Sequence, residues 1–337
     1  MVSMKDISKM CGVSIATVSK ALNDQNDIGA ETKERIRRVA KNLGYFPNSS
    51  ALALKTKRTY NLGILFEDAS KSGLTHDFFA YVLNGFKKIA ESFGYDITFI
   101  GTGKANKKMT YLEHCRYRGF DGIVIACADF DNPEVEELIK SEIPLVTIDH
   151  LFNGRAAVIS DNISGMRELV TYIYGCGHRR IAYIHGTNSA VTRNRLSSFF
   201  KTAEELGVIV PDAYVLEAAY RDTEQAGRAT RELLALPEPP TCIIYPDDYS
   251  CFGGMNVIRE CGLRIPEDIS VAGYDGLVMG HLLKPQLTTL LQDAEALGSG
   301  AAKKLIELIE KPRTAIPDQT LIRGTLFEGQ TVGRPRQ

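Results

Sequence analysis

Short runs rich in β-branched and aromatic residues recur between residues 61 and 275, and each comes before a stretch with helical character. In order, the runs are NLGILF, DITFIG, GIVIAC, PLVTID, AAVISD, RIAYIHG, TCIIYPDD and ISVAGYD. Such alternation predicts α/β architecture, with parallel, doubly wound sheets covered by helices. Because residues 59–337 are too many for one compact sheet of this kind, we expect two lobes.

The composition excludes several classes of protein. Of the 337 residues, 44% are hydrophobic and 24% charged, and no apolar run approaches the roughly 18 residues of a membrane helix. The N-terminus lacks the plan of a secretion signal, so we expect a cytoplasmic protein without a membrane partner. The seven cysteines form no C-x-x-C pair, and phosphate-binding glycine motifs are missing. We therefore expect reduced thiols, no metal and no cofactor.

Charge is divided unevenly along the chain. Residues 1–58 hold 11 Lys and Arg against 5 Asp and Glu, whereas the rest of the chain holds 29 against 36. A basic head before an acidic body is typical of a nucleic-acid-binding segment joined to a separate ligand-binding domain. A solvated charged surface is the alternative, although it would give a milder asymmetry.

The basic head predicts three short helices. Ser3, with Asp6 three residues later, caps the first, and Gly12 ends it. Ser14 caps the second, and a third runs from about residue 30 to residue 43. This order matches a helix-turn-helix, in which the second helix enters the major groove. Three amphipathic helices also occur in inert bundles, so the pattern alone leaves that alternative open.

The second helix has two different faces at 100° per residue. One face is expected to pack and holds Thr17, Val18, Ala21 and Leu22. The other is expected to be free and holds Ile15, Ala16, Ser19 and Lys20.

The runs SMKDISKMCGVSIATVSKALND and ETKERIRRVAKNLGYFPN strongly resemble the DNA-binding headpiece of the LacI/GalR transcriptional regulators. The resemblance implies that Ile15, Ala16 and Lys20 read bases, with Ser3, Ser14, Thr17 and Ser19 as further DNA-binding residues. Lys20 stands where an Arg is frequent, and Lys lacks the planar two-donor fork that suits guanine. A phosphate contact is therefore the alternative for Lys20.

The segment NSSALALKTKRT resembles the hinge helix of the same family, which orders when two subunits dock in the minor groove. By this resemblance Leu54 wedges between base pairs, Ala51 faces the groove floor, and Asn48 and Lys55 also contact DNA. Leu52 replaces the usual Arg. A plain basic linker is the alternative. The expected organisation is a headpiece over 1–46, a hinge over 47–58 and a two-lobed core over 59–337.

Several carboxylates follow the predicted strands directly. Asp149, Asp161, Asp247, Asp248 and Asp275 each stand where a β-rich run ends. Ligands of open α/β sheets gather at the carboxyl ends of strands, so these side chains are candidates for a shared pocket. Each is also a candidate helix N-cap, an alternative that is weaker for Asp275 in its turn-like GYDG sequence.

The family resemblance continues through CGHRRIAYIHG, RLSSFFKTAEELG, DDYSCFGGMNVIRECGLRIPEDISVAGYDG and PQLTTL. It implies a core like periplasmic sugar-binding proteins, with effector held between two lobes. The implied effector-binding residues are Phe78, Phe79, Asp149, Arg195, Asp248 and Asp275, although core packing is the alternative for the two phenylalanines. Asp247 replaces the usual Asn, which argues against an anionic effector, and Ser198 replaces a usual Gly, which we expect to crowd the start of its helix.

These features together predict a homodimeric repressor that binds operator DNA under the control of a neutral sugar or oligosaccharide. A purine or another metabolite is the alternative effector within the same family. A carbohydrate-active enzyme using Asp248 and Asp275 as acid and nucleophile is the rival from another class. That rival explains neither the basic headpiece nor the hinge, so we expect the protein not to be an enzyme.

Overall fold

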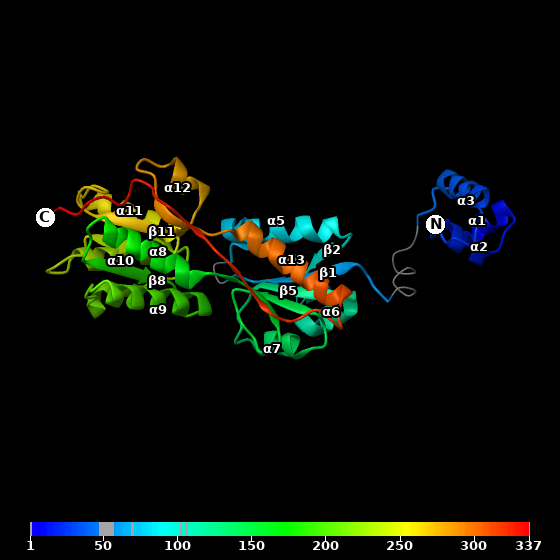
Figure 1. The fold of residues 1–337 in the computed structure, drawn as a ribbon, viewed down its shortest axis with the longest axis horizontal. Helices are drawn as coiled ribbons and strands as arrows, with labels where there is room; N and C mark the ends of the chain where they lie inside the picture. The colour runs from blue at the N-terminus through cyan, green and yellow to red at the C-terminus, as the bar shows by residue number, and fades with distance from the viewer. Residues whose placement is uncertain (1, 47–56, 69–70, 102, 105–106, 337) are drawn as a thin grey trace. The chain divides into compact units, whose positions relative to one another are not determined.

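The computed structural model describes residues 2–46, 57–68, 71–101, 103–104 and 107–336 (Figure 1). Contacts divide the chain into two compact units, Met1–Thr59 and Tyr60–Gln337. The first unit contains α1 (Met4–Cys11), α2 (Ile15–Leu22) and α3 (Ala30–Asn42).

The three helices of the first unit pack around a small apolar core. The core side chains are buried and come from all three helices: Ile7, Cys11, Val18, Ala21, Ile36 and Ala40. As predicted, α1 stops where Gly12 takes up a left-handed φ of 61°. The Ser14 hydroxyl accepts the Thr17 N–H and so begins α2.

The second unit has two lobes, each built on a six-stranded sheet. The first sheet is parallel and has the order β13-β7-β6-β5-β1-β2. Its strands are β1 (Asn61–Phe66), β2 (Asp96–Phe99), β5 (Gly122–Cys127), β6 (Leu145–Ile148), β7 (Ala156–Ser160) and β13 (Gln319–Ile322). One face is covered by α5 (Asp77–Ser92) and α13 (Ala294–Glu310), and the other by α6 (Tyr111–Arg118) and α7 (Pro133–Lys140) (Figure 1).

The second sheet has the order β14-β12-β11-β10-β8-β9 and is parallel except for β14. Its strands are β8 (Ile181–His185), β9 (Val215–Glu217), β10 (Cys242–Ile244), β11 (Ser270–Asp275), β12 (Thr288–Leu291) and β14 (Thr325–Phe327). One face packs against α8 (Asn162–Gly175) and α9 (Ala190–Glu205), and the other against α10 (Thr223–Leu234) and α11 (Asp248–Glu260). The short helix α12 (Val278–Leu282) follows β11.

All eight β-rich runs contain a strand, which confirms the predicted α/β class. One connection was predicted wrongly, because no helix separates β6 from β7. The seven residues 149–155 return the chain beside β6 through left-handed turns at Asp149 and Gly154. The strands β9, β12, β13 and β14 were not predicted, since each is only three or four residues long.

Within the described residues the chain passes between the lobes three times: from β7 to α8, from β12 to α13, and from β13 to β14. The first and third passages are joined, since the Asp161 N–H donates to the Ile322 carbonyl at 2.8 Å. These passages place the carboxyl ends of both sheets beside the same hinge.

None of the described helices is long and apolar enough to cross a membrane. All seven cysteines are free, and Cys11, Cys115, Cys242 and Cys251 are buried. In the described ranges, no three His, Cys, Asp or Glu side chains are grouped so as to hold a metal ion.

Candidate functional site

The outer face of α2 is exposed as the sequence predicts. Ile15 is 48% exposed, Ala16 and Lys20 are also exposed, and Val18 and Ala21 are buried on the opposite face. Two of the other predicted DNA-binding residues lie at helix starts. The hydroxyls of Ser14 and Thr17 are hydrogen-bonded to each other, and the N–H and hydroxyl of Ser3 donate to Asp6. Ser19 is half-buried.

Lys20 already has a partner in the headpiece, because its ammonium forms an ion pair with Asp27. The hydrogen bond from Lys20 holds the pKa of Asp27 below its usual value. Both groups are about half exposed, so DNA can compete for the lysine. The pair was not predicted, since Asp27 lies seven residues away beyond the end of α2. The predicted hinge contacts Asn48, Ala51, Leu54 and Lys55 lie outside the described residues.

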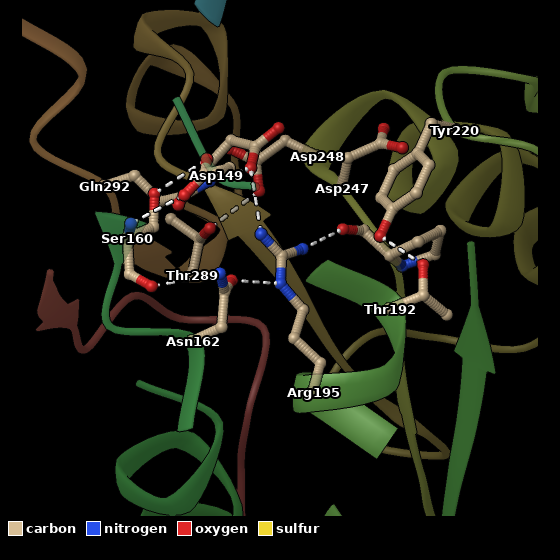
Figure 2. Close-up of polar contacts among 12 residues, drawn as sticks. Asp149, Ser160, Asn162, Thr192, Arg195, Tyr220, Asp247, Asp248, Thr289 and Gln292 are labelled. Atoms are coloured by element: carbon tan, nitrogen blue, oxygen red, sulfur yellow. Dashed lines mark hydrogen bonds and ion pairs between the residues drawn. The ribbon is translucent and has the colours of Figure 1, made fainter. Parts of the chain in front are cut away.

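Arg195 is the centre of a polar cluster where the two lobes meet (Figure 2). This side chain of α9 is only 3% exposed. Its Nε donates to Asn162 Oδ1 at 2.7 Å, and its Nη1 donates to the Pro246 carbonyl at 2.8 Å. The guanidinium lies 3.6 Å above the Tyr274 ring. A buried guanidinium held on three sides is a rigid donor for a ligand.

Asp275, at the end of β11, lies beside Arg195 as predicted. The nearest atoms, Arg195 Nη2 and Asp275 Oδ1, are 3.9 Å apart. Gln292 Nε2 donates to the same Oδ1 at 2.6 Å, and the backbone of Asp275 has a φ of 107°. Burial raises the pKa of Asp275 to about 7, although Arg195 opposes this shift. The carboxyl group can thus act as a donor or an acceptor near neutral pH.

Asp149 comes from the other lobe, at the end of β6. Its oxygens accept the Ser160 N–H at 2.6 Å and the Ser160 hydroxyl at 3.0 Å. Burial raises the pKa of this carboxyl above its usual value. Ser160 precedes the first passage between the lobes, and its carbonyl accepts from Asn162 Nδ2 at 3.1 Å. A chain of hydrogen bonds therefore connects Asp149 to Arg195 through the hinge (Figure 2).

Asp247 and Asp248 both accept hydrogen bonds from other groups of the second lobe. Asp247 is the N-cap of α11, accepting the Ser250 N–H at 2.8 Å. Asp248 is buried and accepts from Thr289 Oγ1 at 2.7 Å and the Leu277 N–H at 2.6 Å. Burial raises its pKa well above the usual value, with Asp275 adding to the effect. In this arrangement Asp248 supports β12 and the loop after β11, and the effector contact implied by the resemblance stays a prediction.

Two smaller expectations are also settled by local geometry. Asp161 is the N-cap of α8, with its carboxylate accepting the Ser164 N–H at 3.0 Å. Ser198 lies in the middle of α9 and not at its start, and its hydroxyl donates to the Ile163 carbonyl at 2.6 Å. The crowding predicted at the helix start was therefore wrong.

Phe78 and Phe79 lie in the first turn of α5, and both are half-buried against the core of the first lobe. Phe79 packs on Phe66 and His76, with ring centroids 5.0 Å and 4.9 Å apart. Core packing, the alternative named for these residues, therefore accounts for part of each ring.

Several members of the cluster were not predicted. Asn162 and Gln292 orient Arg195 and Asp275, and Tyr220 shares a 2.9 Å hydrogen bond with Thr192 (Figure 2). Asn162 follows the predicted strand β7, and that position was its signal in the sequence, whereas Gln292 and Tyr220 follow β12 and β9, which the sequence did not predict. Tyr220 comes three residues after β9, a strand of only three residues. A strand that short has too weak a pattern to draw attention to the residue after it.

Comparison with known proteins agrees with this architecture. A family model described as bacterial regulatory proteins of the lacI family matches residues 3–48, and one described as a periplasmic binding protein-like domain matches residues 170–332. The chain is 31% identical to the probable HTH-type transcriptional repressor ExuR of Bacillus subtilis (strain 168), over 93% of each chain.

Two solved structures share the fold. The Lac repressor dimer bound to operator and the anti-inducer ONPF is 23% identical and matches with a TM-score of 0.82, covering 98% of this chain and 99% of that one. The transcriptional regulator CelR in complex with cellobiose is also 23% identical, with a TM-score of 0.71 over 98% of this chain and 100% of that one.

The Bacillus subtilis relative is named as a repressor. In this chain the lacI-family match lies in the helix-turn-helix unit, and the periplasmic binding protein-like match lies in the two-lobed core that follows it. The protein is a DNA-binding transcriptional regulator and not an enzyme. The chain belongs to the LacI family of bacterial regulatory proteins.

Proposed function

We propose that this regulator represses transcription from a near-palindromic operator and that a neutral polyhydroxylated effector, held between the lobes, controls its affinity for DNA. The observation that carries the effector site is the pairing of buried Arg195 with Asp275 beside the passages between the lobes. A ligand that bridges both lobes favours one lobe angle, and that angle sets the spacing of the two hinge segments in a dimer.

A neutral sugar fits the chemistry of this cluster better than an anion does. Asp149, Asp247 and Asp275 are all buried carboxyls whose pKa values are raised by burial, so added negative charge is unfavourable there. Carboxyl and guanidinium groups exchange hydrogen bonds with hydroxyls, and the exposed part of Phe79 offers an apolar surface to a sugar ring. The structure of CelR in complex with cellobiose, which shares the fold, supports a sugar as the class of effector.

A thermal-shift panel of neutral sugars, sugar acids and nucleobases tests the effector class, followed by calorimetry on each hit. A specific ligand stabilises the fold by mass action. We expect a neutral mono- or oligosaccharide to raise Tm in wild type and to have little effect in Asp275→Ala. The matched control is Asp131→Ala, which removes an exposed carboxylate elsewhere in the first lobe. A nucleobase or sugar acid that binds instead would replace the neutral-sugar assignment.

DNA recognition is assigned to the exposed face of α2, with Ile15 and Ala16 in apolar contact and Lys20 in polar contact with the major groove. Ser3, Ser14, Thr17 and Ser19 are assigned to the same interface. Because its target is DNA, we place the protein in the cytoplasm. Band-shift titrations of Lys20→Ala should show weaker operator binding, whereas Lys303→Ala, which removes a charge from the second unit, should leave operator binding unchanged.

A homodimer is the assembly that suits a two-fold operator. The short helix α12 exposes an apolar face, with Val278, Met279 and Leu282 at 59%, 54% and 75% exposure. We assign this face to a second copy of the chain, because burying it removes apolar area from water. Leu282→Glu should shift the protein to monomer in sedimentation experiments. Ile209→Glu is the control, since Ile209 is equally apolar and 86% exposed elsewhere in the same lobe.

A further inference from the structure

Asp77 joins the two lobes by direct contact. It lies in the first turn of α5, in the first lobe. Its Oδ2 accepts the Tyr249 hydroxyl at 2.7 Å and lies 3.4 Å from Arg221 Nη1, and both of these residues belong to the second lobe. The Arg221 guanidinium stacks 4.0 Å above the Tyr249 ring. One carboxylate thus meets a hydroxyl and a cation that already contact each other.

The two residues in the second lobe are held in place by the same helix cap. Asp247, the N-cap of α11, accepts the Arg221 N–H at 2.8 Å, and Tyr249 is the second residue of that helix. The Arg221 backbone has a left-handed φ of 62°, which directs the chain toward this cap. Asp247 also accepts two hydrogen bonds from Ser250, so the positions of Arg221 and Tyr249 depend on contacts that do not involve Asp77.

Electrostatics keep each group in the form that the contact needs. Burial opposes ionisation of Asp77, but hydrogen bonds from Tyr249 and Arg221 hold its pKa below the usual value. The hydrogen bond to Asp77 and burial together raise the pKa of Tyr249, so the phenol stays protonated and donates a hydrogen bond to Asp77. Burial, with Arg221 adding to the effect, lowers the pKa of neighbouring His76 to about 4, so this ring stays neutral.

We propose that Asp77, Arg221 and Tyr249 form a latch that holds the two lobes together across the effector cleft. The latch adjoins Phe78 and Phe79, so opening it moves the first turn of α5 away from the second lobe. A contact between lobes raises the fraction of molecules already in the closed arrangement, and a ligand that needs this arrangement then binds more tightly and leaves more slowly. The latch itself rests on contacts within the protein and can be tested without an effector.

Hydrogen exchange of the full-length, ligand-free protein tests the latch. Asp77→Ala and Tyr249→Phe should each speed amide exchange by about tenfold in peptides from both sides, residues 76–82 and 247–252. Since both substitutions remove the same hydrogen bond, the double variant should exchange no faster than the faster single variant. Arg221→Met keeps the backbone bond to Asp247 and should have a smaller effect.

Tyr81→Phe is the matched control, because it removes a phenolic hydroxyl from an exposed position on the same helix. It should leave exchange unchanged on both sides. The latch is overturned if the two substitutions act additively, or if each speeds exchange only in the lobe that carries it. These outcomes do not depend on which effector the protein binds, so they can be interpreted even if no ligand in the thermal-shift panel binds.

Discussion

At the scale of single residues, similar aspartates after strands serve different purposes. Asp161 and Asp247 cap helices, Asp149 is bound to Ser160, and Asp248 supports the neighbouring strand. Asp275 differs because its partners, Gln292 and Arg195, both approach the same carboxyl oxygen. It is therefore the aspartate best placed to offer an oxygen to a ligand.

The raised pKa of Asp275 predicts a pH dependence of stability. The pKa of Asp275 rises from 3.8 to about 7 on folding, so the folded state binds the carboxyl proton more tightly than the unfolded state does. Stability should therefore fall as pH rises from about 4 to 7, and one such group contributes at most about 1.4 kcal/mol per pH unit. Asp275→Asn should reduce this slope in urea unfolding at pH 5, 6, 7 and 8, whereas Asp131→Asn should not. Equal slopes in wild type and Asp275→Asn would contradict the prediction.

The ion pair between Lys20 and Asp27 predicts that the free headpiece restrains its own lysine. Asp27→Asn should free the Lys20 ammonium and tighten operator binding by about two- to fivefold, as expected for an exposed pair. Glu34→Gln is the control, since it removes the same charge from another exposed position of the headpiece. If both variants tighten binding equally in band-shift titrations, net charge and not the pair is responsible.

At the scale of elements, two glycines allow α5 and α13 to pack closely in the first lobe. A Cβ at Gly85 would lie 2.2 Å from the Glu295 carbonyl oxygen, and one at Gly298 would lie 1.8 Å from the Val82 carbonyl oxygen. Such distances are far inside van der Waals contact, so any side chain must separate the helices. The close approach helps to hold α13 in the first lobe, after the chain has crossed from β12.

Gly298→Ala should therefore destabilise the protein by about 1–3 kcal/mol, the usual cost of overpacking. The measurement is the midpoint of urea unfolding. Gly300→Ala, on the same helix, is the matched control because its Cβ would meet only Val158, at an ordinary 3.4 Å. A destabilisation of the same size in both variants would point to a general effect of alanine in α13.

The hinge prediction belongs to the same scale, although its residues lie outside the described ranges. Leu54→Ala should weaken operator binding by about tenfold or more and leave binding to random DNA nearly unchanged, because a wedge acts only where DNA kinks. Leu52→Ala is the control, as it shortens a leucine that is not assigned to the wedge. Equal losses on operator and random DNA would show that the hinge interpretation is wrong.

At the scale of the whole molecule, the basic head and acidic body divide DNA binding from ligand binding. Arg195 lies in the second compact unit, whereas Ile15, Ala16 and Lys20 lie in the first. We therefore propose that effector and operator influence each other through the lobe angle and the hinge. Thermodynamic linkage requires that this influence be reciprocal.

Arg195→Ala should consequently leave operator affinity close to wild type. It should weaken effector binding by roughly 30-fold to several thousand-fold, the range for removing a charged partner from a buried site. Titrating effector into free protein and into the operator complex measures both affinities. In wild type, the effector affinity of the free protein and that of the operator complex should differ by the same factor by which effector changes operator affinity. A variant that responds like wild type would place the effector site elsewhere.

The sequence by itself determined the features that depend on short-range patterns. The three headpiece helices, the eight β-rich runs and the positions of Arg195 and Asp275 follow from periodicity, caps and family motifs. These signals are local because helix and strand periods, and the residues that end them, act within a few positions of the chain.

Only the tertiary structure decided which side chains meet. It buried Asp248 behind β11, omitted a helix between β6 and β7, and brought Asp77 to Arg221 and Tyr249, which are 144 and 172 positions away. Contacts of this kind depend on how the lobes pack and where the chain crosses between them, and no local pattern records that choice. Burial then decides which carboxyl groups are hydrogen-bonded within the protein and which can still bind a ligand, because buried polar groups need hydrogen-bond partners and the fold determines which partners are near.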